Sequence, residues 1–219
     1  MERWPEHSVD LLLLTFAAGS LDALCYLRTH AFTANMTGNT VLLGLSIFGH
    51  DRQRTVPCLI ALAGFLTGVA IAAVFLMRTS AANDAAAGLR YGLALEIPAL
   101  CIFCAVWLVG GDVFVASAAL LVSGACALGI QSVAVRRLKI TGVVTTFITG
   151  TMTAAVVDTI AGKHVPESEG AAQPLLLAAM FVTYLIAAAA GALLYNVQHG
   201  AAPFAPVIAT AIAALRCRP

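Results

Sequence analysis

The segment Pro57–Met77 (PCLIALAGFLTGVAIAAVFLM) decides the fold, because it includes no charged side chain along its whole length. The hydrocarbon core of a bilayer is about 30 Å thick, and an α-helix needs about 20 apolar residues to cross it. The segment therefore predicts a transmembrane helix. Gly64 and Gly68 within it have the small-xxx-small spacing that is typical of close helix packing in membranes.

Seven more apolar segments lie on either side of this one. They are Val9–Leu27, Thr33–Phe48, Tyr91–Val109, Val113–Val135, Gly142–Gly162, Pro174–Asn196 and Pro203–Leu215. The last is the shortest of them and suits an interfacial or re-entrant piece as well as a crossing. We expect an all-α polytopic transmembrane helical bundle of seven or eight segments, with residues 1–219 as a single integral membrane domain.

The composition supports a membrane protein and excludes several other classes. Apolar residues make up 60% of the chain and charged residues 11%, against about 45–50% and about 25% in soluble domains. The mean hydropathy is +0.92. A net charge of +1 gives no basic field for nucleic acid. The bilayer is the expected partner, and the sequence does not predict the oligomeric state.

The distribution of Lys and Arg leaves the orientation open. With eight crossings, these residues divide equally between the two sides of the membrane. With seven, the C-terminal arginines change sides and one side carries twice as many as the other. The positive-inside rule gives no orientation until the number of crossings is known.

The two halves of the chain share a pattern. Thr33–Gly38 and Thr145–Gly150 both read Thr-x3-Thr-Gly, and each lies in the second apolar segment of its half. The pattern predicts repeats over 9–109 and 113–215, each with four segments. Because an even number of crossings preserves direction, the repeats are expected to be parallel, as in several transporters.

Two acidic residues lie inside apolar segments, where ionisable groups are costly and often functional. Asp22 is interpreted either as part of a buried polar network or site, or as an interfacial residue. Glu96 is followed closely by Pro98, which frees a backbone carbonyl. Glu96 is interpreted either as a carrier of a proton or cation, or as an interfacial partner of Arg90.

The Thr-Gly elements have a functional and a structural interpretation. A helix broken at Gly38 or Gly150 would leave a free helix N-terminus that could face an anion, as discontinuous helices hold substrates in transporters. Small and hydroxyl-bearing residues also serve as ordinary helix-packing contacts in membranes. The candidate substrate-binding residues are Asp22, Thr33, Thr37, Gly38, Asn39, Glu96, Gln131, Thr145, Thr149 and Gly150.

The chain contains no catalytic or nucleotide-binding motif, so an enzyme is not expected. Its six cysteines are interpreted as small buried hydrophobes. Its histidines have no partner at metal-ligand spacing, so neither a metal site nor a cofactor is expected.

Several of these motifs resemble those of the YoaK-like family of small bacterial multipass membrane proteins. The residues that carry the resemblance are Gly19-x2-Asp22, Tyr26-Leu27, Phe32-x4-Thr37-Gly38-Asn39, Gly129-Ile130-Gln131 and Thr145-Thr146-x2-Thr149-Gly150-Thr151. Ser132 stands where that family usually has Asn. The resemblance implies a multipass fold in the bacterial inner membrane and supplies no substrate.

Two functions follow as hypotheses. The first is a secondary transporter or channel for a small solute or ion, with Asp22, Asn39, Glu96 and Thr149 converging on one polar cavity. The second is a non-transporting assembly partner or sensor, whose polar residues only pack helices. The substrate, the coupling ion and the direction of transport are not encoded in any recognisable motif.

Overall fold

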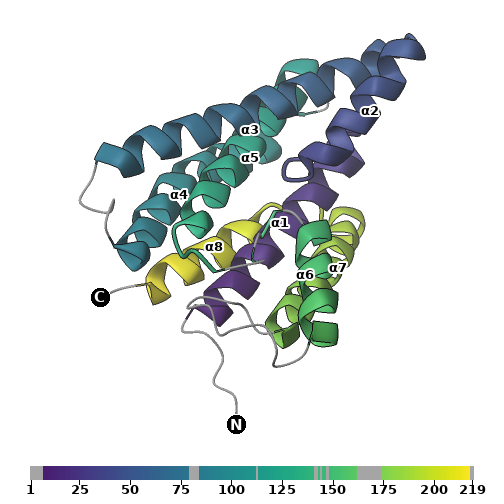
Figure 1. Ribbon diagram of the computed structural model, residues 1–219. Helices are drawn as coiled ribbons and strands as arrows, with labels where there is room; N and C mark the ends of the chain where they lie inside the picture. Colours follow the sequence, from purple (N-terminus) through teal and green to yellow (C-terminus); the bar gives the residue numbers. More distant parts are fainter. Residues whose placement is uncertain are drawn as a thin grey trace.

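The computed structural model describes residues 7–78, 84–111, 113–140, 143, 145–146, 148–161 and 174–217. Within these ranges the chain forms helices and no strand, as the hydropathy pattern predicts. Figure 1 shows the helices, which are α1 (Ser8–Thr29), α2 (Met36–Phe48), α3 (Arg52–Arg78), α4 (Ala85–Val109), α5 (Phe114–Arg136), α6 (Ile148–Ala161), α7 (Pro174–Val197) and α8 (Phe204–Arg216).

Five of these helices (α1, α3, α4, α5 and α7) are long and apolar enough to cross a membrane. The other three are short, since α2, α6 and α8 have 13, 14 and 13 residues. At 1.5 Å per residue these three are only about 20 Å long. The predicted segment Gly142–Gly162 is thus shorter as a helix than expected, and both its end residues lie outside the described part of the chain.

Helices α1 and α5 form the centre of the bundle, and α3 and α7 lie outside them. Over the most apolar 18 residues of each helix, 72% of the residues of α1 and 67% of those of α5 are buried, against 28% in α3 and in α7. The outer helices leave large side chains such as Leu66 and Leu185 exposed, as lipid contact requires. The backbones of the inner helix α5 and the outer helix α3 approach each other closely. A Cβ atom added to Gly68 of α3 would lie only 2.1 Å from the carbonyl oxygen of Cys126 in α5.

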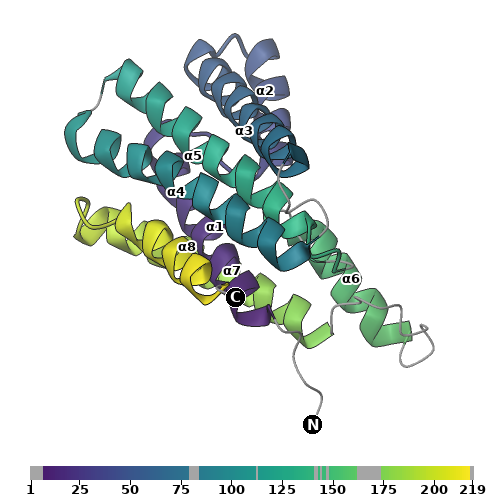
Figure 2. The same ribbon diagram turned by 90° about the vertical axis from the view of Figure 1, so that its left-hand side faces the viewer.

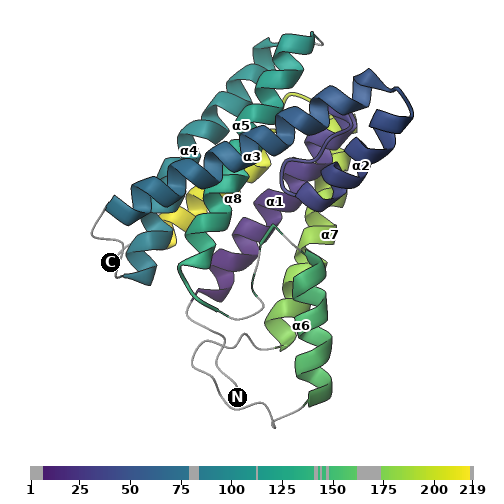
Figure 3. The ribbon, with the colours of Figure 1, turned by 45° about the horizontal axis from the view of Figure 1, so that its top comes forward.

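The contacts between helices fix their directions. Gln131 of α5 donates to the carbonyl of Leu14 in α1 at 3.1 Å. Further along α1, Asp22 binds Thr33, whose methyl group lies 3.0 Å from the Cβ position of Gly124. Because Leu14 pairs with the later residue of α5 and Asp22 with the earlier one, α1 and α5 are antiparallel, as Figures 1 and 3 show.

The short helices α2 and α6 do not make separate crossings. After α1 the chain returns to the level of Asp22, and α2 then runs on in the direction of α1 (Figure 1). In the same way α6 runs on in the direction of α5 (Figure 2). Within each half the chain therefore runs in three alternating directions, through α1 with α2, α3 and α4 in the first half, and through α5 with α6, α7 and α8 in the second.

This arrangement contradicts the parallel relation between the halves. The prediction treated Thr33–Phe48 and Gly142–Gly162 as complete crossings, which made the number per half even. Because α1 and α5 are antiparallel, the second half begins in the opposite direction to the first. Duplication itself stays a prediction, but any repeat of this kind is inverted.

Candidate functional site

The carboxylate of Asp22 holds the loop between α1 and α2. Its two oxygens accept hydrogen bonds from five donors in the loop and in α7. The donors are the N–H groups of Thr33 (2.7 Å), Ala34 (2.6 Å) and Asn35 (3.2 Å) and the hydroxyls of Thr33 (3.1 Å) and Tyr184 (2.5 Å). Asp22 thus belongs to a buried hydrogen-bond network. Residues 33–35 are not helical because their backbone N–H groups bind this side chain.

Two asparagines complete the same turn. The Asn39 side chain accepts from the Phe32 N–H at 2.8 Å and donates to the Phe32 carbonyl at 2.7 Å. Asn35 caps α2 by accepting from the N–H of Gly38 at 3.0 Å. A Cβ on Gly38 would lie 2.9 Å from this Asn35 side chain, so the cap favours glycine. The Met-Thr-Gly-Asn sequence is therefore a helix start.

The second half has a corresponding turn before α6. Gln131 donates from Nε2 to Oγ1 of Thr145 at 2.9 Å, and the hydroxyls of Ser132 and Thr146 are 2.9 Å apart. Gln131 Oε1 is buried and has no hydrogen-bond partner among the described residues. Gln131 thus connects this turn to α1 through Leu14, while Asp22 connects its own turn to α7.

A cavity of about 280 Å³ lies between the starts of α2 and α6 and the side of α7. Its lining residues are Asn35, Thr37, Gly38, Val41, Thr146, Thr149 and Tyr184. The two helices run away from it in opposite directions (Figures 1 and 3). Since the first N–H groups of a helix have no intrahelical partners, the cavity lies between two positive helix ends.

The predicted site residues divide into three groups. Thr37, Gly38 and Thr149 line the cavity, and Gly150 follows Thr149 in the first turn of α6. A second group supports the two turns behind the cavity. Its members are Asp22, Thr33, Asn39, Gln131 and Thr145. Tyr184 was not predicted; its signal is a phenol in the middle of the apolar segment Pro174–Asn196.

Glu96 forms the third group and lies away from this cavity. It is fully buried between α4 and α8, where Thr210 lies 3.4 Å from its Oε1 and its Oε2 has no partner in the described structure. The prediction that Glu96 converges with Thr149 is therefore wrong. The alternative pairing with Arg90 is not formed either, since Thr210 is the one hydrogen-bond partner of Glu96 among the described residues. The Arg90 guanidinium instead lies 5.0 Å from the centre of the Tyr91 ring.

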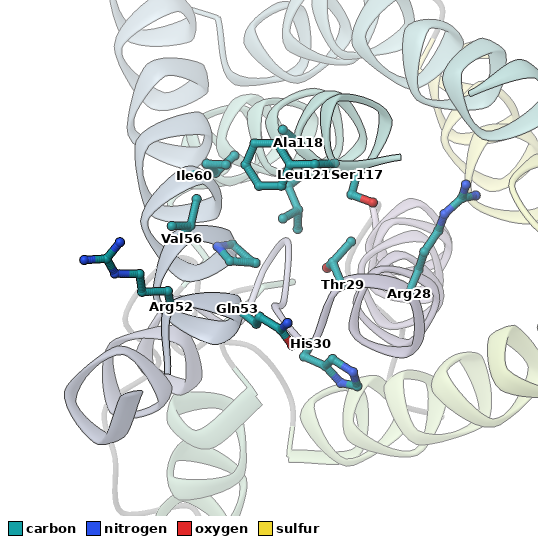
Figure 4. A pocket seen from close by; sticks show the side chains of 12 residues that line it. Arg28, Thr29, His30, Arg52, Gln53, Val56, Ile60, Ser117, Ala118 and Leu121 are labelled. Carbon is teal, nitrogen blue, oxygen red and sulfur yellow. The ribbon is translucent and has the colours of Figure 1, made fainter. Parts of the chain in front are cut away.

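Two larger cavities carry the nearby positive charges. One, of about 370 Å³, shares Thr146 with the central cavity and is also lined by Arg136 and Lys139. The other, of about 540 Å³, lies among the end of α1 and the starts of α3 and α5. Figure 4 shows the guanidinium groups of Arg28 and Arg52 on opposite sides of this cavity. Arg28 also lies 4.9 Å from the centre of the Trp107 ring.

The helices, their lipid-facing surfaces and the polar turns inside the bundle define a multipass helical membrane protein. The chain belongs to the family described as "Protein of unknown function (DUF1275)", whose model matches residues 11–216. It is similar to the UPF0700 transmembrane protein YoaK of Bacillus subtilis (strain 168), with 40% identity over 156 residues. That alignment covers 70% of this chain and 67% of YoaK. No solved structure matches.

Proposed function

We propose that this protein is a secondary transporter or channel for a small polar solute or ion in the bacterial cytoplasmic membrane. One observation carries the proposal: Thr37 and Gly38 of α2 line the same cavity as Thr149 of α6, although the two helices belong to opposite halves of the chain. Interrupted helices whose ends meet inside a bundle hold the substrate in several transporter folds.

The lining of the cavity supports a polar solute. Hydroxyl groups come from Thr37, Thr146, Thr149 and Tyr184, and the described lining residues include no Asp, Glu, Lys or Arg. The adjoining cavity carries Arg136 and Lys139 and meets the central one at Thr146. Positive helix ends and nearby cations favour a small anion or a hydroxyl-rich neutral solute. The Asp22 carboxylate, which binds Asn35 and Tyr184 behind the cavity, opposes an anion, so both solute classes are tested.

The packing of the helices supports an inverted repeat as the frame for this site. In one half α2 packs on α3, and in the other α6 packs on α7. Helix α1 packs on α7 and α8, while α5 packs on α3 and α4. Each of these contacts thus has a counterpart in the other half, whereas the small contact between α3 and α4 has none of similar size in the described structure. Inverted repeats with a site at their interface are common among secondary transporters.

The experiment measures solute entry into proteoliposomes by light scattering after an osmotic step. The solutes are potassium chloride, nitrate and formate in the presence of valinomycin, together with glycerol and urea. The variant Thr37→Val/Thr149→Val removes two cavity hydroxyls at almost constant shape. Its control, Thr40→Val/Thr153→Val, makes the same change in the same helices, where each hydroxyl binds its own helix one turn back.

We expect the wild type to pass at least one of these solutes faster than empty vesicles do. The cavity variant should lose most of this flux, and the control should keep it. Wild-type vesicles that are no more permeable than empty ones to every solute would contradict the proposal. Equal loss of flux in the two double variants would contradict the assignment of the cavity.

The non-transporting role is the second candidate, and one observation favours it. The strongest polar contacts, those of Asp22 and Asn39, are made to the protein's own backbone. In that case the same variants would change thermal stability and leave the permeability of the vesicles equal to that of empty ones.

A further inference from the structure

The two ends of the described chain meet beside the polar end of α1. His7 is the residue before α1, Asp10 lies in its first turn, and Cys217 follows α8. A ring nitrogen of His7, a carboxylate oxygen of Asp10 and the sulfur of Cys217 all lie within 4.8 Å of one another. Asp10 and Cys217 are buried, and His7 is half-buried.

We propose that His7, Asp10 and Cys217 form a site for a divalent metal ion of the zinc class. Imidazole, carboxylate and thiolate are the ligands that Zn²⁺ uses in proteins. Ca²⁺ and Mg²⁺ prefer all-oxygen ligands, so the sulfur selects against them. Asp10 and Cys217 lie at opposite ends of the sequence, which is why the spacing of the histidines along the chain gave no sign of the site.

The distances suit a site that closes around the ion. Tetrahedral zinc with bonds of about 2.0–2.3 Å places its ligand atoms about 3.5 Å apart. Nδ1 of His7 lies 3.4 Å from Oδ2 of Asp10, which already matches this separation. The sulfur lies within 4.8 Å of the other two ligand atoms, so it needs to approach by at most about 1.3 Å, which rotation of one side chain supplies.

Arg216 orients the carboxylate and moderates its charge. Its Nε lies 2.9 Å from Oδ1 of Asp10, which leaves Oδ2 facing His7. A hydrogen bond to the non-ligating oxygen is the usual second contact of a metal-bound carboxylate. Because a metal-bound cysteine is a thiolate, binding of the ion displaces a proton from the Cys217 thiol.

Three protein ligands leave one tetrahedral position for water or an external group. The ion joins the start of α1 to the end of α8 and therefore holds the first and last helices together. Its binding should stabilise the fold increasingly as the metal concentration rises. The site does not depend on the central cavity, so it is tested without any transport measurement.

The test uses the full-length protein, reduced, freed of metal and kept in mild detergent. We expect one equivalent of Co²⁺ to produce the absorption of a thiolate-to-cobalt charge transfer, and Zn²⁺ to abolish it. ZnCl2 should raise the unfolding temperature, and MgCl2 should not. Cys217→Ser should remove the absorption and weaken zinc binding at least about 100-fold, since even changes around the ligands cost about 10–100-fold.

The control is Cys101→Ser, which removes an exposed thiol on α4 and should leave both signals unchanged. The proposal fails if wild-type protein gives no thiolate absorption with Co²⁺, or if the absorption survives Cys217→Ser. If Cys217→Ser does not fold, alkylation of the wild type decides instead. Saturating Zn²⁺ should slow the alkylation of Cys217 relative to metal-free protein and leave that of Cys101 unchanged, and equal rates at Cys217 with and without Zn²⁺ would overturn the site.

Discussion

Gln131 donates a hydrogen bond to the hydroxyl of Thr145 in the turn that follows its helix, just as Asp22 accepts one from the hydroxyl of Thr33. Each pair joins the inner helix of one half to the turn before a short helix. Thr33 and Thr145 are also the first residues of the two Thr-x3-Thr-Gly patterns, so they occupy the same place in each half. In both turns a side chain of the inner helix therefore binds the first threonine of the pattern, but this side chain is a carboxylate in the first half and an amide in the second.

Asp22→Ala should be strongly destabilising. It leaves the buried N–H groups of Thr33 and Ala34, and the partly buried N–H of Asn35, without their acceptor. Each unsatisfied buried donor costs about 1–3 kcal/mol, so we expect a loss of several kcal/mol and a lower unfolding temperature in detergent. Asp84→Ala is the control, because Asp84 caps α4 from an exposed position and its loss should cost about 1 kcal/mol.

Tyr184→Phe separates the phenol from the rest of the Asp22 network. It removes one of the five donors and leaves the backbone contacts intact. The loss should be about 1.5–3 kcal/mol, as for a single hydrogen bond to a charged group, and thermal unfolding measures it. A loss as large as that of Asp22→Ala would mean that α7, and not the turn, is the main partner of Asp22.

Gly68→Ala should separate α3 from α5. Its new Cβ would lie 2.1 Å from the backbone oxygen of Cys126, which no side-chain movement relieves. We expect a destabilisation of about 1–3 kcal/mol by thermal unfolding, as for other overpacked contacts. Gly44→Ala in α2 meets nothing within 4 Å and should be neutral or stabilising by up to about 1 kcal/mol. Equal effects at both positions would rule out backbone contact as the cause.

The long helices could be predicted from the sequence because their apolar segments match or exceed the bilayer thickness. Pro57–Met77 lies wholly within α3, and Pro174–Asn196 ends one residue before α7 does. The start of α2 was placed at Thr33 instead of Met36, because hydropathy does not reveal that Asp22 binds the backbone of residues 33–35. Because the Asp22 carboxylate holds this turn, α2 continues in the direction of α1, and the segments predicted as two separate crossings follow one path.

The candidate site was harder to predict, because proximity in the fold is not encoded by spacing. The Thr-Gly pattern identified Thr37 and Thr149, which do line one cavity. Glu96 looked equivalent to Asp22 as an acid in an apolar segment, but it faces Thr210 on α8 instead. The sequence offers no means of telling which helix a buried carboxyl faces.

The directions of the helices now predict the orientation that the sequence left open. Of the described Lys and Arg residues, six lie at the end where α1 begins, namely Arg78, Arg90, Arg136, Arg137, Lys139 and Arg216. Three lie toward the other end, namely Arg28, Arg52 and Arg54. The positive-inside rule then predicts that the start of α1 and the end of α8 face the cytoplasm.

Cysteine labelling tests this orientation with two substitutions that change no charge. Gln53→Cys at the start of α3 should react with a membrane-impermeant maleimide in right-side-out vesicles. Ala86→Cys at the start of α4 should react only after the vesicles are opened. Both positions are exposed, so accessibility within the fold does not bias the comparison. The opposite labelling pattern would reverse the orientation.

We expect the buried carboxyl group of Glu96 to lower the free energy of unfolding. Its one hydrogen bond in the described structure, from Thr210, is long at 3.4 Å, and its buried Oε2 has no partner there. Burying a polar group without full hydrogen bonding is unfavourable, and an apolar replacement of similar volume is often neutral or stabilising. Glu96→Met should therefore unfold at the same or a higher temperature, whereas Thr210→Val, which removes that hydrogen bond, should lower the unfolding temperature by a small amount.

The flux assay then decides why Glu96 is present. If Glu96→Met gains stability and loses solute flux, Glu96 serves transport from its place between α4 and α8, because residues retained against stability are typical of functional sites. If the variant gains stability and keeps full flux, Glu96 has no part in the transport that we propose. A variant that unfolds at a clearly lower temperature would instead mean that the carboxyl group stabilises the contact between the two helices.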